Sequence, residues 1–327
     1  MTRTVLVTGG AGFIGAYVTR RLLQEGSRVL VYDLQPRGNV LDLLVPNHQD
    51  STNPPVLEQG EITDGFRLMA LCRKYDVDSI VHLASPLTMD VVANPATGVR
   101  DICLGTHTVF ATAREAGLRR VVWASSVAIY GPASDYPPGP LSETAFHRAP
   151  NLYGASKSLC ETMAKQMSET DGLDLVGLRL SVVYGAGRRR GYMTYHSALL
   201  RDAALTDSML VRYGDQKLHW QYVEEVADMA LTALNSRRRG EGRVYNAFGD
   251  CRSWREAAGI VKALKPALRV EVRDEVDQAL SGSVEDYEAT AFTSDYGTAR
   301  QWPLEKGIAD TLATYEGIAA TTRADVA

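Results

Sequence analysis

Residues 8–15 read TGGAGFIG and directly follow a short, β-branched run at residues 4–8. Apolar side chains then recur at helical spacing over residues 12–25. A strand, a glycine turn and a helix in this order can hold the pyrophosphate of a dinucleotide, because no Cβ obstructs the backbone and the first helical N–H groups attract the charge. This stretch predicts a dinucleotide site formed by Gly9, Gly12, Phe13, Ile14 and Gly15.

An acidic residue follows the turn at the distance that such a site requires. Asp33 ends a second expected strand, residues 28–32, about twenty residues beyond the glycines. There a carboxylate can accept hydrogen bonds from both adenosine ribose hydroxyls and would repel a 2′-phosphate, which favours NAD over NADP. The nearby Arg37 weakens that preference. The alternative is a plain tight turn with a solvated aspartate, which two signals in register make the poorer explanation.

Further strands and helices alternate along the first half of the chain. This alternation predicts a parallel sheet with helices on both faces, and near-continuous apolar strands such as residues 79–83 fit burial on both sides. The loop at 131–150 is too long for a tight connection, so we expect it to be functional. We expect strands at 4–8, 28–32, 56–59, 79–83, 121–124, 175–180 and 243–248, and helices at 12–25, 68–75, 97–116, 152–170, 192–204, 222–236 and 253–264.

Composition bounds the class of protein. The 327 residues carry a net charge of −4, and 45% are apolar, as in globular domains. No basic field favours nucleic acid, no apolar stretch reaches membrane length, and no signal peptide precedes the first strand. The four cysteines form no C-x-x-C pair and the six histidines have no metal-ligand spacing, so we expect no metal and a cytoplasmic location.

A serine, a tyrosine and a lysine form the candidate catalytic group. Ser125 and Ser126 end the expected fifth strand, at the sheet edge where ligands bind in open α/β folds. Tyr153 and Lys157 are four residues apart and share one helix face. Phenols are weak bases, with a pKa of about 10, and a neighbouring ammonium favours the phenolate. Tyr153 could thus take a proton from a carbinol, with Ser126 on the substrate oxygen, while a nicotinamide accepts the hydride.

Together these motifs resemble the extended short-chain dehydrogenases/reductases of the NAD-dependent epimerase/dehydratase group. The resemblance covers nearly the whole chain and implies a Rossmann-type doubly wound parallel sheet with a smaller, mixed α/β C-terminal substrate-binding region. We expect residues 1–180, with 220–250 returning to them, to bind NAD and residues 181–327 mainly to bind substrate. The motifs are TGGAGFIG, Asp33, GEITD at 60–64, HLA at 82–84, Ser125 and Ser126 with Tyr130 and Gly131, Tyr153 with Lys157, and Trp302 with Pro303.

The resemblance also implies roles for individual residues. Ile62 and Asp64 would flank the adenine, and Ala84 would lie along the cofactor. Tyr153 would be the acid/base and Lys157 would hold the nicotinamide ribose. Ser126, five residues before Gly131, would orient the substrate, and Ser125 could share this role. The resemblance further implies a homodimer that pairs the helices near 97–116 and 152–170.

Several positions depart from the family pattern. Ile102 stands where a supporting asparagine is usual, and Val127 and Ala128 replace the acidic pair of dehydratases, which argues against dehydration. Val182 and Leu218 replace an asparagine and an arginine that sugar-nucleotide enzymes use. Lys217 or the basic loop at 188–190 could substitute for the arginine. The substrate pocket that we predict contains Ser125, Ser126, Ser181, Val182, Arg188 and Trp220.

Three hypotheses follow from this pattern. The first is an NAD-dependent oxidoreductase acting on a secondary alcohol, such as a sugar, a sugar acid or a similar small molecule. The second is a nucleotide-sugar epimerase with tightly bound NAD, in which a transient ketone is reduced from its other face. The third, a non-catalytic NAD-binding sensor, is disfavoured because Tyr153 and Lys157 are both present.

Overall fold

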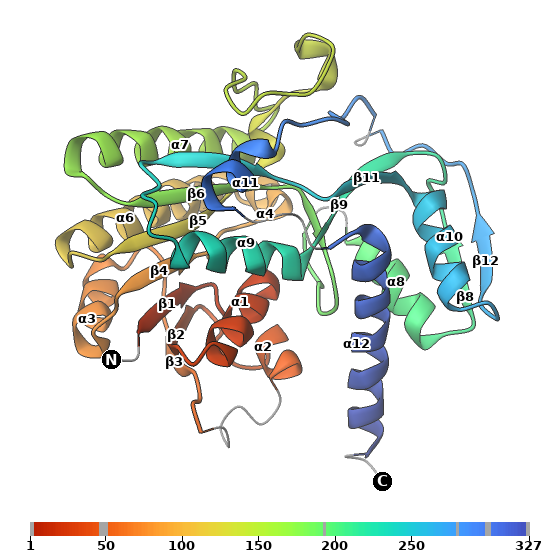
Figure 1. Cartoon of the computed structure of the whole chain (residues 1–327), viewed down its shortest axis with the longest axis horizontal. Helices are drawn as coiled ribbons and strands as arrows, with labels where there is room; N and C mark the ends of the chain where they lie inside the picture. Colours follow the sequence, from red (N-terminus) through yellow and green to blue (C-terminus); the bar gives the residue numbers. More distant parts are fainter. Residues whose placement is uncertain (1–2, 46–51, 192–193, 279–280, 298–301, 325–327) are drawn as a thin grey trace.

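A seven-stranded, fully parallel sheet forms the larger part of the protein (Figure 1). The computed structural model describes residues 3–45, 52–191, 194–278, 281–297 and 302–324. The strand order is β10-β6-β5-β4-β1-β2-β3, which confirms the predicted doubly wound α/β class. The strands are β1 (Thr4–Thr8), β2 (Arg28–Asp33), β3 (Val56–Gln59), β4 (Ser79–His82), β5 (Arg120–Ser126), β6 (Leu175–Leu180) and β10 (Arg243–Ala247).

Helices cover both faces of this sheet, and successive strand residues serve the two layers in turn. Val5 and Val7 belong to one core cluster, whereas Leu6 belongs to the other, because neighbouring side chains of a strand point to opposite faces. The first cluster includes residues of α1 (Phe13–Gln24), α2 (Val40–Leu44) and α9 (Val223–Asn235). The second includes residues of α3 (Gly65–Tyr75), α6 (Gly105–Glu115) and α7 (Leu152–Asp171).

The helical segment before β5 differs from the single helix predicted at 97–116. It consists of α5 (Pro95–Val99), a π-helical turn at Arg100–Leu104, and α6. A short helix, α4 (Thr88–Ala93), precedes it, and Asn94 caps α5 by accepting a hydrogen bond from the Thr97 N–H. Periodicity alone did not reveal the π turn, which inserts one residue per turn into an otherwise continuous helix.

A second, smaller region follows β6 almost immediately and holds two small sheets (Figure 1). In the first, β9 (Lys217–Tyr222) lies between β7 (Val182–Tyr184), which is parallel to it, and β11 (Asp250–Ser253), which is antiparallel. In the second, β8 (Ser208–Val211) pairs in parallel with β12 (Arg269–Val272). Helices α8 (Tyr195–Leu205) and α10 (Trp254–Leu264) lie in the same region, and α11 (Thr290–Tyr296) contacts β10. Residues 192 and 193 of the predicted helix at 192–204 lie outside the described residues.

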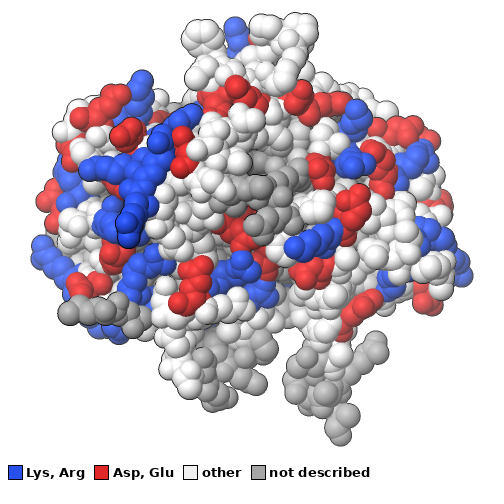
Figure 2. Space-filling view, in the orientation of Figure 1, with Lys and Arg blue, Asp and Glu red and all other residues white. Residues whose placement is uncertain are grey.

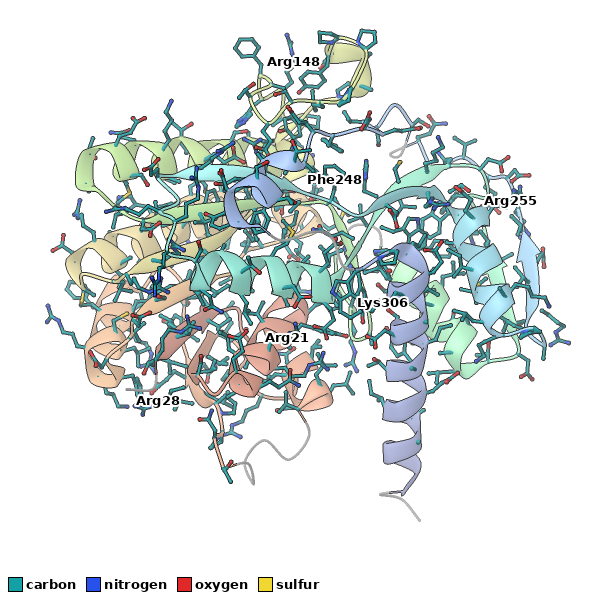
Figure 3. All side chains as sticks on the ribbon, viewed as in Figure 1. Arg21, Arg28, Arg148, Phe248, Arg255 and Lys306 are labelled. Carbon is teal, nitrogen blue, oxygen red and sulfur yellow. The ribbon has the colours of Figure 1, made fainter. Side chains whose placement is uncertain are left out.

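The last helix, α12 (Leu304–Ala324), was not predicted. Its buried residues Leu304, Ile308, Leu312 and Tyr315 recur at helical spacing, so the sequence did hold the signal. The helix continues as far as residue 324, and residues 325–327 lie outside the described part. Near the start of α12, the Lys306 ammonium lies 4.0 Å from the centroid of the Trp302 ring (Figure 3).

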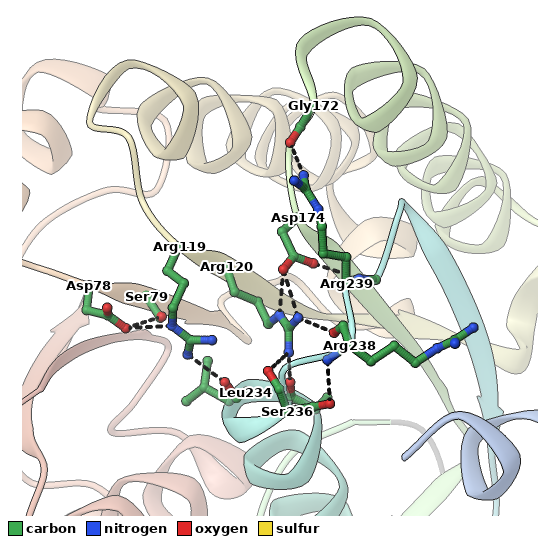
Figure 4. Close-up of polar contacts among 12 residues, drawn as sticks. Asp78, Ser79, Arg119, Arg120, Gly172, Asp174, Leu234, Ser236, Arg238 and Arg239 are labelled. Atoms are coloured by element: carbon green, nitrogen blue, oxygen red, sulfur yellow. Dashed lines mark hydrogen bonds and ion pairs between the residues drawn. The ribbon is translucent and has the colours of Figure 1, made fainter.

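Two arginines at the amino edge of the sheet attach the C-terminal end of α9 (Figure 4). The last four carbonyl groups of a helix have no partner within the helix. The buried Arg120 side chain donates to the carbonyls of Ala233 and Ser236 and pairs with Asp174 at 2.8 Å. Arg119 donates to the Leu234 carbonyl at 2.6 Å. These bonds account for a buried arginine far from the carboxyl edge of the strands.

Surface charge, helix composition and metal-ligand spacing bear on which partners this protein has. Acidic and basic side chains lie beside one another over most of the face in Figure 2. Within the described residues, no helix has the length and apolar composition needed to cross a membrane. Nor does that part of the chain contain three His, Cys, Asp or Glu residues placed to hold a metal ion.

Candidate active site at the carboxyl edge of the sheet

The glycine turn joins β1 to α1 and packs tightly against two neighbouring loops. Gly9 has a φ of +69°, and a Cβ there would lie 2.7 Å from the Ala84 nitrogen. A Cβ on Gly15 would lie 2.0 Å from the Gly9 carbonyl oxygen. The Gly9 N–H donates to the Tyr32 carbonyl at 2.8 Å, which ties the turn to β2. Glycine is therefore required at Gly9 and Gly15 by the turn itself, before any ligand is considered.

The N-terminus of α1 offers backbone donors at this turn. The helix begins at Phe13 with Gly12 as its N-cap, and no side chain of the described residues caps it. Its first turn contains no acidic residue. The N–H groups and the positive end of the helix dipole thus suit the phosphates of a dinucleotide.

Asp33 lies at the end of β2, beside the same turn. Its Oδ2 accepts a hydrogen bond from the Ala11 N–H at 3.2 Å, and its Oδ1 accepts one from the Gln35 N–H at 3.1 Å. Burial raises the pKa of Asp33, and the backbone N–H groups oppose that shift. Each carboxylate oxygen keeps a further lone pair, so Asp33 can still accept from ribose hydroxyls.

The remaining predicted cofactor residues lie in the loops after β3 and β4. Ile62 packs against α6, because a Cβ on Gly105 would lie 2.6 Å from its Cγ2. Asp64 is the N-cap of α3, where its Oδ1 accepts from the Arg67 N–H at 3.0 Å. Ala84 lies against Gly9, as described above. All three therefore stand at the edge of the sheet that carries the glycine turn.

The structure brings the serine strand and the Tyr153 helix together at one point. A Cβ on Gly154 would lie 2.0 Å from the Ala128 carbonyl oxygen, so the first turn of α7 presses on the 3-10 turn at Val127–Ile129. Ser126 caps that turn by accepting the Ala128 N–H at 3.1 Å. These contacts set the start of α7 directly beside the end of β5.

Lys157 is held between the same two elements. Its Nζ donates to the Ala124 carbonyl of β5 at 2.9 Å and lies 5.9 Å from the centroid of the Tyr153 ring. The Lys157 side chain is buried, so it is held in one place between β5 and α7. A phenol, an ammonium and a serine hydroxyl in this arrangement suit proton exchange with an alcohol or a ketone.

Comparison with known proteins agrees with this geometry. The sequence model of the NAD dependent epimerase/dehydratase family matches residues 5–247. The chain belongs to this family. It is an enzyme of the NAD-dependent epimerase and dehydrogenase type, and its cofactor is NAD. The glycine turn, the uncapped N-terminus of α1 and Asp33 fit that cofactor.

Relatives and solved structures within the family differ in activity. The chain is 31% identical to a UDP-glucose 4-epimerase of Streptococcus mutans, over 72% of this chain and 73% of that protein. The structure of a UDP-glucose 4-epimerase from Thermotoga maritima, with UDP-glucose, matches with a TM-score of 0.82 at 20% identity, over 97% of this chain and 99% of the other. An L-threonine dehydrogenase from Clostridium difficile matches equally well, with a TM-score of 0.82 at 19% identity, over 97% and 98%. At these identities the two structures establish the fold alone.

The remaining predicted substrate residues lie in two places, some in the segment after β6 and Trp220 on β9. Ser181 and Val182 follow β6, and the Ser181 N–H donates to the Gln221 Oε1 at 2.9 Å. Arg188 donates to the Val183 carbonyl. Burial lowers the pKa of Arg188 to about 10, while the charge of Tyr153 acts in the opposite direction.

Trp220 and Leu218 lie in the core. Trp220 is 1% exposed, and its indole N–H donates to the Arg252 carbonyl at 3.1 Å. Its ring contacts Tyr184 and Trp254. Leu218 is 4% exposed. Trp220 was predicted as a pocket residue, but it offers a substrate almost no surface, so it takes no part in the site that we propose.

A buried ion pair lies next to the candidate catalytic group, and the sequence analysis missed it. Arg179 of β6 pairs with Glu161 of α7 at 2.8 Å, and both side chains are 6% exposed. Burial lowers the pKa of Arg179, but the hydrogen bonds and charge of Glu161 outweigh this and raise it overall. Ser125 donates to Glu161 at 2.6 Å, and Arg179 donates to the Tyr130 hydroxyl at 2.7 Å. The Ser125 hydroxyl is thus directed into this network.

Glu143 fixes the long loop at 131–150 to this network. Arg179 donates to the Glu143 carbonyl at 2.8 Å, and the Glu143 side chain accepts the Asn246 N–H at 2.9 Å. Leu141 forms an isolated bridge with Tyr287 of the C-terminal region. The loop projects from the body of the protein, and Arg148, which Figure 3 labels, ties its second half back through an N–H bond to the Ile129 carbonyl at 2.9 Å. The loop therefore connects the Arg179–Glu161 network with the C-terminal region.

Proposed function

We propose that this enzyme is a dehydrogenase that transfers hydride between NAD and a secondary alcohol, such as a sugar, a sugar acid or a similar small molecule. The observation that carries the proposal is the packing of α7 on β5, which assembles Ser126, Tyr153 and Lys157. Leu218 favours a dehydrogenase over a nucleotide-sugar epimerase. It is buried and apolar where sugar-nucleotide enzymes carry an arginine for the diphosphate.

Each residue of the group has a separate task in this proposal. Bound NAD supplies the hydride acceptor. Tyr153 removes the proton from the alcohol oxygen, and Ser126 donates a hydrogen bond to that oxygen. Lys157 stabilises the tyrosinate and holds the nicotinamide ribose. Residues 1–180, together with the returning part of 220–250, bind NAD through Gly9, Gly12, Phe13, Ile14, Gly15, Ile62 and Ala84, and residues 181–327 mainly bind substrate.

The substrate side depends on fewer residues. Ser181 and Val182 would line the pocket next to Tyr153, and Arg188 would supply its positive charge. A cation close to the reacting hydroxyl suits a substrate with a carboxylate near the carbinol, as in a sugar acid. We therefore place sugar acids first among the alcohols to be tested.

An epimerase with tightly bound NAD remains the second candidate. The relative from Streptococcus mutans, a UDP-glucose 4-epimerase, favours it. In that case Ser126, Tyr153 and Lys157 would act in both directions on one bound substrate, and Arg188 or Lys217 would contact the diphosphate. No net NADH would appear.

We further propose that the enzyme is a cytoplasmic homodimer. Leu104, Leu152 and Leu159 lie on or next to the neighbouring helices α6 and α7 and are 49%, 53% and 49% exposed. A second copy of the chain would cover these leucines by pairing the same two helices. The four cysteines are free thiols, which suits a reducing compartment.

The decisive experiment separates the two activities. The protein is purified without added cofactor, and its released nucleotide is identified. NAD and a panel of secondary alcohols, sugars, sugar acids and sugar nucleotides are then added while the absorbance near 340 nm is followed. We expect steady NADH formation with one class of alcohol. Copurified NAD and isomer formation from a sugar nucleotide, without NADH, would overturn the dehydrogenase in favour of the epimerase.

Asp33 provides a test of the cofactor site that does not require a substrate. We expect Asp33→Asn to weaken NAD binding about ten- to hundredfold, because a hydrogen bond to a charged group contributes about 1.5–3 kcal/mol. Binding is measured by calorimetry with the purified protein. Asp76→Asn is the matched control, because Asp76 lies at the far, C-terminal end of α3. Equal affinities of the two variants would exclude Asp33 from the ribose site.

A further inference from the structure

Two of the four cysteines meet at the contact between α7 and the π-helical turn. Cys103 lies in that turn and Cys160 lies on α7. The Cys103 thiol lies 3.9 Å from the Ser156 carbonyl, and the Cys160 thiol lies 3.6 Å from the Ile102 carbonyl. Each sulfur therefore lies against the backbone of the other segment, one helical turn or one residue from the other cysteine.

The two thiols differ in character. Cys103 is partly exposed, whereas Cys160 is fully buried. The neighbouring Cys160 thiol lowers the pKa of Cys103 to about 6, with Ser156 and Lys157 adding to the shift and burial opposing it. The neighbouring Cys103 thiol and burial together raise the pKa of Cys160. Cys103 is thus the nucleophilic thiolate of the pair, and Cys160 is a neighbouring thiol that can react with an oxidised Cys103.

We propose that Cys103 and Cys160 form a thiol-oxidation site, which a hydroperoxide converts into a reversible disulfide beside the catalytic helix. In the first step the Cys103 thiolate attacks hydrogen peroxide and the O–O bond breaks, which gives a sulfenic acid and a hydroxide that takes a proton from solvent to become water. In the second step the Cys160 sulfur displaces water from that sulfenic acid, and the S–S bond forms. Two thiols are oxidised by two electrons and the peroxide is reduced. A small dithiol restores both thiols by exchange.

This site is connected to the cofactor site through α7 and through a chain of hydrogen bonds. Lys157 precedes Cys160 by three residues on α7. Thr106, at the start of α6, follows Cys103 by three residues, and its hydroxyl lies 3.2 Å from the His82 Nε2. The His82 Nδ1 lies 2.7 Å from the Thr8 hydroxyl, directly before the glycine turn. Closing the S–S bond, which is about 2.05 Å long, draws the π turn and α7 together at this level.

We therefore expect oxidation to weaken NAD binding several-fold. The reduced protein, freed of reductant, is treated with about one equivalent of hydrogen peroxide. Of its four thiols, two should disappear, the intact mass should fall by about 2 Da, and peptide mapping should find a Cys103–Cys160 bridge. Dithiothreitol should restore both the thiols and the NAD affinity, which is measured by calorimetry.

Single variants separate the two steps. Cys160→Ser should stop at a sulfenic acid that dimedone traps on Cys103, and Cys103→Ser should keep its remaining thiols under the same treatment. Cys72→Ser and Cys251→Ser, the matched controls, should still form the bridge. Four surviving thiols in the treated wild-type protein, or a bridge that involves Cys72 or Cys251, would overturn the proposal. Thiol counting and mass need no turnover, so failure of the proposed dehydrogenase activity would leave this test intact.

Discussion

Replacing Tyr153 with phenylalanine should lower kcat by about 10²–10⁴-fold, the usual contribution of a general acid–base group. The variant lacks only the hydroxyl, so the ring that lies 5.9 Å from the Lys157 ammonium is kept. NAD binding should therefore change little. Turnover is followed at 340 nm with the substrate that the panel identifies, and NAD binding is measured by calorimetry.

Two controls make the result specific. Tyr136→Phe removes a hydroxyl from the loop at 131–150 and should leave kcat nearly unchanged, because Tyr136 bonds only loop backbone in the described structure. Lys157→Met should lower both kcat and NAD affinity, since Lys157 is proposed to act on Tyr153 and on the ribose. Full activity of Tyr153→Phe would refute the assignment of Tyr153 as the acid/base.

The sequence revealed those parts of the enzyme whose residues are close together along the chain. The glycine turn, Asp33 and the pair of Tyr153 and Lys157 are each defined by local spacing, and their strand–helix context was readable. The parallel pairing of the first six strands followed from their alternation with helices. The clash that forces glycine at Gly15 is also local, because it involves the Gly9 carbonyl.

Features that depend on distant contacts were not predictable from spacing. Trp220 looked like a pocket residue, yet β9 carries it into the core between Tyr184 and Trp254. Arg179 is separated from Glu161 by a strand connection, and nothing local indicates that they pair. One signal was available, because an arginine inside the apolar strand at 175–180 requires a buried partner. That signal predicts a partner but does not identify it.

The largest effect on stability is expected from Arg179. Arg179→Met should lower the free energy of unfolding by about 3–5 kcal/mol, because it leaves the Glu161 carboxylate buried without its cation. Urea denaturation followed by circular dichroism measures the change. Lys165→Met is the matched control. It removes one partner of the exposed Lys165–Glu169 pair, where side chains are 73% and 63% exposed, and should cost about 0–1 kcal/mol.

A double variant distinguishes a lost ion pair from a merely unfilled space. Arg179→Met combined with Glu161→Leu removes both charges, so it should recover much of the stability lost in Arg179→Met. It should not recover full activity, because Ser125 and Tyr130 both lose a charged partner beside the catalytic group. If the double variant were less stable than Arg179→Met alone, the cost would come from packing rather than from the uncompensated charge. The buried pair would then be a space-filling element of the sheet, with no role in holding α7 and β6 together at the active site.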